Sequence, residues 1–209
     1  MIKRKLTGIV PMIYCFFNKK NQIDTKFIED EIKLINSLNV KGIACLGLGT
    51  EVNKLSFKEK VQIIELISKY KSKNTYLTIT ISGEKYTDQL KLIKVANANR
   101  ADWLVLQPPA KKKLNDSECL DFFSNIIRNV SNNTFVGVQN APEYLGVGLG
   151  AKKILKLKQR HSNFQLLKGE GSAVIVEQLV HDLEGQMQVF NGRGGIELVD
   201  SLRAGCAGL

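Results

Sequence analysis

The chain has 209 residues, of which 44% are hydrophobic and 24% are charged. This composition is typical of one soluble globular domain and excludes intrinsically disordered and collagen-like proteins. The net charge of +10 is compatible with nucleic-acid binding, but the lysines are spread over most of the expected helices, and the only dense run, Lys111, Lys112 and Lys113, lies in an expected loop. We therefore expect solvated helix faces and no nucleic-acid partner.

Two further patterns concern location and metal binding. No apolar run approaches the roughly 20 residues that a membrane span needs, and the N-terminus lacks the apolar region of a signal peptide. We therefore expect a cytoplasmic protein without membrane contact.

The four cysteines are widely separated, form no C-x-x-C pair and have no histidine near them in the sequence, so we expect no disulfide framework, no metal site and no cofactor. They are Cys15, Cys45, Cys119 and Cys206.

The chain alternates between short apolar runs and segments with helical periodicity. Residues 25–38 and 57–69 place their apolar side chains on one helix face, as helices that cover a sheet do. Apolar runs that are followed by turn residues and then by such a segment indicate consecutive β-α-β units on a parallel sheet. Eight runs are expected to be strands: residues 8–15, 42–47, 76–82, 103–107, 134–139, 164–168, 187–191 and 205–209.

Eight such units favour an α/β fold of the (β/α)8 (TIM) barrel type, formed as a single domain by residues 1–209. Complete barrels of this type take about 250 residues. This chain stops inside its eighth expected strand, so we expect a barrel that is cut short and lacks the last helix and any C-terminal helical extension. The competing architecture is an open doubly wound sheet, which is disfavoured because no G-x-G-x-x-G sequence follows the first expected strand.

The sixth expected strand ends in Lys168, a charged residue at a position where a parallel barrel strand is normally buried. Active sites of (β/α)8 barrels lie at the C-terminal ends of the strands. Burial disfavours the charged ammonium group, and a neutral lysine amine can attack a carbonyl carbon to form an imine. The alternative is a structural ion pair with Glu170, which would share the face of Lys168 if the strand continued.

Two other expected strands end in turns that are candidates for substrate binding. After the second strand, Gly49 and Thr50 lie in a G-L-G-T-E turn whose backbone N–H groups can hold a carboxylate. The alternative is a tight turn that binds nothing. After the fifth strand, Gln139 and Asn140 precede Pro142, and the alternative is an ordinary turn built on asparagine and proline.

The order of these residues resembles the family of dihydrodipicolinate synthase and N-acetylneuraminate lyase, which are class I aldolase-type barrels that condense or cleave pyruvate through a lysine imine. Residues 17–24 resemble the family's F-D-x-x-G-x-I-D turn, residues 47–51 its carboxylate-binding G-[TS]-T-G-E loop, and residues 139–142 its Y-N-x-P motif. The resemblance covers the whole chain and places the imine lysine on Lys168. It implies that Gly49, Thr50, Asn140 and Gly192 bind substrate.

The chain departs from the family pattern at its acid/base positions. Gln139 stands where the family has a tyrosine, Leu48 where a proton-relaying hydroxyl residue is expected, and Tyr144 where a substrate-binding arginine is usual. A glutamine cannot shuttle protons by changing its charge. Tyr144 is a candidate replacement, and the alternatives are a bound water, the substrate's own carboxylate, or a role for Tyr144 in loop packing alone. The resemblance thus indicates a divergent member of the family.

The expected function is a lyase of the aldolase type that acts on a 2-oxo acid, such as pyruvate or a 2-keto-3-deoxy sugar acid, through a Schiff base. Lys168, Gln139 and Tyr144 are the expected catalytic residues. A Schiff-base dehydratase of a sugar acid is an alternative, and a catalytically inactive fragment or binding module is the alternative from another class. The resemblance also implies a homo-oligomer, either a dimer or a tetramer.

Overall fold

The computed structural model describes residues 5–109, 114–146 and 148–209. The expected lysine-rich loop at residues 111–113 lies outside these ranges. Six parallel strands form one sheet in which each strand lies beside its successor in the sequence. They are β1 (Gly42–Cys45), β2 (Tyr76–Ile81), β3 (Trp103–Leu106), β4 (Phe135–Asn140), β5 (Phe164–Gly169) and β6 (Gln188–Asn191).

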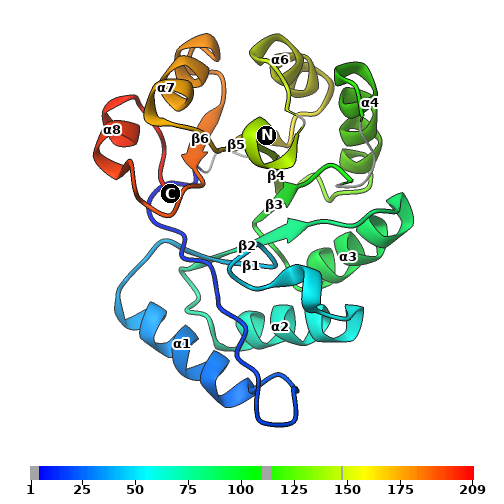
Figure 1. The fold of residues 1–209 in the computed structure, drawn as a ribbon, viewed down its shortest axis with the longest axis vertical. Coiled ribbons are helices and arrows are strands. Elements are labelled where there is room, and N and C mark those ends of the chain that lie inside the picture. The colour runs from blue at the N-terminus through cyan, green and yellow to red at the C-terminus, as the bar shows by residue number, and fades with distance from the viewer. Residues whose placement is uncertain (1–4, 110–113, 147) are drawn as a thin grey trace.

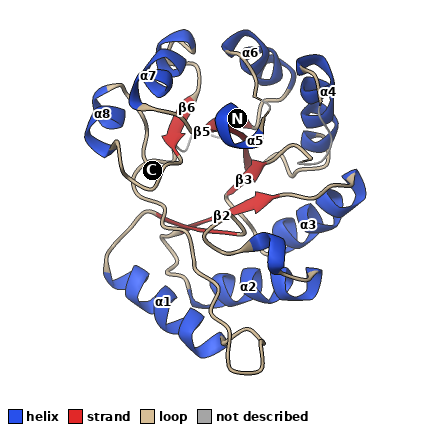
Figure 2. Cartoon of the chain, viewed as in Figure 1, coloured by secondary structure: helices blue, strands red, loops and turns tan. Residues whose placement is uncertain are grey.

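Helices surround the strands, and the sheet is curled into a partial barrel (Figure 1 and Figure 2). Most helices connect one strand to the next, as the α/β prediction requires. They are α1 (Thr25–Ser37), the short 3-10 helix η1 (Val52–Lys54), α2 (Phe57–Tyr70), α3 (Tyr86–Ala98), α4 (Asp116–Ile127), α5 (Pro142–Leu145), α6 (Ala151–Arg160), α7 (Ala173–Asp182) and α8 (Leu198–Arg203).

The prediction of eight strands is not confirmed, because the first and last expected strands are absent from the six strands of the described sheet. Their segments instead form single parallel bridges, between Gly8 and Gly208, between Met12 and Ala44, and between Phe190 and Gly208. Pro11 has no N–H to donate, and Gly8 has a φ of 94°, so neither residue can continue a regular ladder. Gly8 and Gly208, which lie near opposite ends of the sequence, are nevertheless neighbours through their bridge.

Two apolar layers follow from the alternation of side chains along each strand. The outer layer lies between the strands and the helices and includes Leu77 and Ile79 of β2 and Leu167 of β5. The inner layer fills the middle of the curled sheet. It consists of Leu6, Tyr76, Trp103, Val105, Phe135, Leu166 and Phe190. Side chains facing the inside at the far ends of the same strands are polar, and these side chains form the site described below.

Local signals explain where the helices begin. The Asp24 carboxylate accepts hydrogen bonds from the N–H groups of Lys26 and Phe27, which caps α1. Ser56 and Glu59 form a capping box that starts α2. The turn at residues 17–24 is a small hairpin, closed by an antiparallel bridge between Phe17 and Ile23.

No helix in the described part of the chain is both long and apolar enough to cross a membrane.

Candidate active site

A β-bulge determines which way Lys168 points. Val136 pairs with Phe164, and Gly137 pairs with Leu166, so β5 has one residue more than β4 at this place. Phe164 therefore packs in the outer layer, whereas Leu166 faces the inside, and Lys168 follows it on the same face. A Cβ on Gly137 would lie 2.4 Å from the carbonyl oxygen of Leu166, so the bulge needs a glycine on the neighbouring strand.

Lys168 is paired with Glu170 at this end of the sheet. Their Nζ and Oε1 atoms lie 2.6 Å apart, and the side chains are 21% and 8% exposed. The ion pair that the sequence offered as an alternative is thus confirmed. Lys168 is only partly exposed, and its side chain reaches past the inner apolar layer into a cavity. An ion pair does not exclude catalysis, since a lysine must pass its proton to some base before it can attack a carbonyl.

Two glutamine side chains connect this ion pair to the neighbouring strands. Gln139, which pairs with Lys168 in the sheet register, is 4% exposed and donates a hydrogen bond of 3.0 Å from Nε2 to Glu170 Oε1. Gln107, directly after β3, donates to Gln139 Oε1. The network runs across β3, β4 and β5 and presents two donors to the Glu170 carboxylate, Nζ of Lys168 and Nε2 of Gln139. This arrangement stabilises a charged carboxylate in a largely buried position.

Gly192, directly after β6, leaves the space that this ion pair needs. A Cβ at Gly192 would lie 2.3 Å from Oε1 of Glu170 and 2.7 Å from Cε of Lys168. No side chain fits at this position without moving the ion pair. The N–H of Gly192 donates to the carbonyl of Gly169, which keeps the loop against the end of β5. Gly192, which the sequence predicted to bind substrate, therefore has a structural role, since its lack of a side chain leaves space for the ion pair.

A cavity of about 300 Å³ opens above Lys168 and Glu170. It brings together four of the seven predicted site residues, namely Lys168, Tyr144, Gly49 and Gly192, from elements far apart in the sequence. The remaining lining residues are Met12, Leu48, Glu170, Arg193 and Ile196. No group of three or more potential metal ligands occurs among the residues that the structure describes.

The glycine-rich turn after β1 lies on the wall of this cavity. The N–H groups of Thr50 and Glu51 donate to Gly47 and Leu48 within the turn. In the described part of the chain, the N–H groups of Leu48 and Gly49 have no hydrogen-bond partner. A Cβ on Gly49 would lie 3.1 Å from the Met12 side chain, so a larger residue would crowd the turn. The turn therefore offers two backbone donors at the cavity wall, as an anion site requires.

Thr50 and Asn140 do not line this cavity, and their side chains hold loops in place. The Thr50 hydroxyl is fully buried, donates to the carbonyl of Ile13 at 2.7 Å and accepts from the N–H of Leu46 at 3.0 Å. The Asn140 amide donates to the carbonyl of Leu149 and accepts from its N–H at 2.7 Å. Their geometry matches the structural alternatives that the sequence left open for both turns.

Tyr144 stands in α5 at the rim of the cavity with 56% of its surface exposed. The sequence did not select Arg193, whose guanidinium pairs with Glu197 at 3.0 Å beside the same cavity. It also did not select Gln107, although a polar residue at the end of an apolar strand was the signal used for Gln139. Glu170 was considered only as a structural partner of Lys168.

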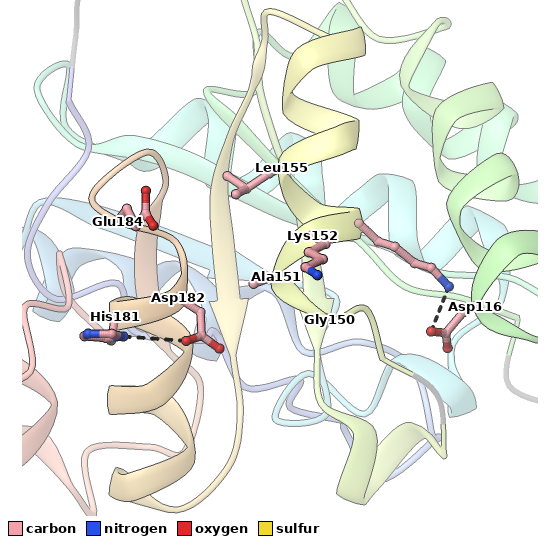
Figure 3. A pocket seen from close by; sticks show the side chains of 9 residues that line it. Asp116, Gly150, Ala151, Lys152, Leu155, His181, Asp182 and Glu184 are labelled. Atoms are coloured by element: carbon pink, nitrogen blue, oxygen red, sulfur yellow. Dashed lines mark hydrogen bonds and ion pairs between the residues drawn. The ribbon is translucent and has the colours of Figure 1, made fainter.

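A second cavity, of about 610 Å³, lies among α4, α6 and α7 (Figure 3). Two pairs of its lining side chains contact each other. Lys153 binds Asp116 at 2.8 Å, and His181 lies 3.6 Å from Asp182. None of its lining residues lies on a strand, and Lys168 does not reach it. The larger volume therefore does not make it the better candidate, because active sites of this fold lie at the ends of the parallel strands, where Lys168 and Glu170 stand.

Comparison with known proteins shows the family to which the chain is similar. Residues 5–209 match the model of the Dihydrodipicolinate synthetase family. A curated 4-hydroxy-tetrahydrodipicolinate synthase from Karelsulcia muelleri (strain GWSS) is 22% identical over 198 residues, which is 93% of this chain and 66% of that protein. The Escherichia coli (strain K12) protein named "Probable 2-dehydro-3-deoxy-D-pentonate aldolase YjhH" is 22% identical over 79% of this chain and 54% of its own length.

Solved structures share the fold as well. YagE from Escherichia coli K12, solved in complex with pyruvate, superposes with a TM-score of 0.89 at 22% identity, covering 97% of this chain and 69% of the YagE chain. The chain spans 66% of the length of the Karelsulcia muelleri synthase and 54% of the length of YjhH.

Proposed function

The chain belongs to the dihydrodipicolinate synthetase family, and from this membership we propose that it is a lyase of the aldolase type, acting on a 2-oxo acid through an imine on Lys168. The observation that carries the proposal is the position of this amine. Lys168 is the one lysine among the residues that line the cavity at the strand ends, and all of those residues are described.

The cavity also suits the carboxylate of a 2-oxo acid. Leu48 and Gly49, whose N–H groups have no partner in the described part of the chain, line the same cavity as Lys168, and paired backbone donors bind carboxylates. A 2-oxo acid held there presents its ketone carbon next to its bound carboxylate. The inner apolar layer, with Leu166 directly below Lys168 on β5, closes the floor of the site. The substrate therefore enters from the loops, as in other barrel enzymes.

In the proposed reaction the neutral Lys168 amine attacks the ketone carbon, and loss of water gives a protonated imine. A base then takes the proton of the hydroxyl group on the far carbon of the bond to be broken, that carbon leaves as an aldehyde, and the electron pair of the broken carbon–carbon bond moves to the positive nitrogen to give an enamine. Reprotonation of the resulting enamine and hydrolysis of the imine release pyruvate and restore the amine. We propose 2-keto-3-deoxy sugar acids as the substrate class, supported by the name of the YjhH relative.

The test is reductive trapping with pyruvate and borohydride, followed by peptide mass spectrometry. We expect one adduct, on Lys168, and none in Lys168→Met. Lys60 and Lys158 are the stringent controls, because desolvation lowers the pKa of both amines and makes them more reactive toward ketones. Lys158→Met should trap pyruvate as the wild type does.

Absence of an adduct, or an adduct on Lys60 or Lys158 in place of Lys168, would contradict the proposal. The first result would favour a catalytically inactive protein. A screen of 2-keto-3-deoxy sugar acids for pyruvate release then separates aldol cleavage from dehydration, since a dehydratase consumes the same acids without releasing pyruvate.

A further inference from the structure

We propose that Glu170 is the acid/base catalyst of imine formation at Lys168, taking the place of the family tyrosine that this chain lacks. The inference rests on the proposed function, since it assigns a role within the same reaction. In this role the ion pair at the end of β5 transfers protons during the reaction, in addition to its structural contact.

The geometry of the carboxylate supports this role. Oε1 of Glu170 lies 2.6 Å from Nζ of Lys168, which is the distance at which a proton passes directly between an amine and a base. Glu170 also lines the same cavity as Lys168, so the carboxylate meets the substrate from the side on which the amine attacks. A glutamate that served only to neutralise the lysine would not need access to this cavity.

No other residue at the cavity combines contact with Lys168 and a change of charge. The lining residues that titrate or carry charge are Tyr144, Lys168, Glu170 and Arg193. Arg193 stays protonated in proteins and is paired with Glu197. Tyr144 is 56% exposed and makes no side-chain hydrogen bond to a described residue. Glu170 is therefore the lining residue that can take a proton from Nζ and return it.

Gln139 fits the same assignment as a positioning residue. It occupies the place of the family tyrosine, and its Nε2 donates to the oxygen of Glu170 that also contacts Lys168. Gln107 fixes the other end of the Gln139 amide. The acid/base function has thus moved from β4 to the residue after β5, and the glutamine at the former position orients the new carboxylate.

The proton balance of the step is complete. Glu170 takes one proton from the Lys168 ammonium, and the neutral amine forms a bond to the ketone carbon while the carbonyl electron pair moves to oxygen. Glu170 returns its proton to that oxygen, takes a second proton from the nitrogen, and gives it to the hydroxyl group, which leaves as water. The products are a protonated imine and a carboxylate, so no oxidant, reductant or further reactant is needed.

The experiment measures the rate of imine formation with pyruvate by quenching with borohydride at timed intervals. We expect Glu170→Gln, which keeps the shape of the side chain, to slow the adduct on Lys168 by about a hundredfold or more. Glu170→Ala should be equally slow and should be accelerated by added acetate, a carboxylate that can enter the vacated space. The matched control is Asp116→Asn, which breaks the distant ion pair with Lys153 and should trap at the wild-type rate.

The possible results separate the two proposals. A wild-type adduct on Lys168 together with a rate within about twofold in Glu170→Gln overturns the role of Glu170 and leaves the imine intact. Slow trapping in Glu170→Ala that acetate does not accelerate also overturns the acid/base role, because it shows that the carboxylate only positions the lysine. No adduct in the wild type overturns both proposals. Circular dichroism spectra of each variant establish that the proteins compared are folded.

Discussion

Leu166 and Lys168 lie on the same face of β5. Leu166 belongs to the inner apolar layer, and Lys168 belongs to the polar site at the strand ends. Leu166 is fully buried among aromatic and aliphatic side chains, whereas Lys168 carries an ion pair at the edge of a cavity. The β-bulge sets the direction of both side chains. One strand thus supplies apolar packing at its beginning and the residues of the proposed reaction at its end, which is the general arrangement in (β/α)8 barrels.

The largest effect on stability is expected at Leu166. Leu166→Ala leaves a cavity in a fully buried layer and should lower the free energy of unfolding by about 2–5 kcal/mol. Urea denaturation measures this loss, and the exposed Val199→Ala on α8 should change it by less than about 0.5 kcal/mol. At temperatures where Leu166→Ala remains folded it should still form the adduct on Lys168. Loss of the adduct in the folded variant would contradict the separation between the inner apolar layer and the site.

The next effect is expected at Gly192, where stability and chemistry meet. Gly192→Ala places a methyl group against Glu170 and Lys168, so it should cost about 1–3 kcal/mol through overpacking. Displacement of the ion pair should also slow imine formation by about tenfold to a hundredfold. Gly150→Ala adds the same methyl group where no atom of the described residues lies within 4 Å, and it should trap pyruvate at the wild-type rate. Equal trapping rates in both variants would show that Gly192 does not protect the ion pair.

A smaller effect is expected at Thr50, whose hydroxyl makes two buried hydrogen bonds. Thr50→Val keeps the shape but removes both, so it should lower the free energy of unfolding by about 1–2 kcal/mol. Thr78→Val is the matched control, because the buried Thr78 hydroxyl has no hydrogen-bond partner in the described part of the chain. That variant should be close to neutral in chemical denaturation. A larger loss in Thr78→Val than in Thr50→Val would reverse the structural assignment of Thr50.

The smallest effect concerns pH and lies outside the site. Burial lowers the pKa of His161, with Arg128 and Arg160 contributing, and the ring hydrogen-bonds the Ser124 hydroxyl at 2.8 Å. The folded state therefore disfavours protonation. The contribution to stability is fully present above the ordinary histidine pKa of about 6.5 and is lost as the pH falls below it. Denaturation curves from pH 7.5 to pH 5 should show a steeper loss of stability in the wild type than in His161→Gln. Parallel curves for the two proteins would contradict this assignment.

The sequence predicted the middle of the fold well because its signals there are local. The helix expected at residues 25–38 is α1, Thr25–Ser37, and six of the eight expected strands are described within one or two residues of their predicted bounds. The two strands at the chain ends were not confirmed, because their pairing depends on each other across the whole sequence. A proline and a positive-φ glycine in the first segment limit that pairing to single bridges.

The site was predictable in its position and less so in its roles. Apolar strands that end in polar residues identified Lys168, Gln139 and Asn140, and the family resemblance placed the lysine. The partner of each polar side chain depends on loops that fold back over the strand ends, and a linear pattern does not contain this information. For this reason the sequence did not predict that Asn140 holds Leu149 or that Gln139 donates to Glu170.

The central claim is that the Lys168 amine forms a covalent bond with the ketone carbon of a 2-oxo acid. Nuclear magnetic resonance of protein labelled with ¹⁵N at its lysine side chains, mixed with pyruvate carrying ¹³C at the ketone carbon, observes that bond directly. We predict a one-bond ¹³C–¹⁵N coupling in the wild type that disappears in Lys168→Arg. A wild-type spectrum containing only free pyruvate and its hydrate, or a coupling that persists in Lys168→Arg, would contradict the claim.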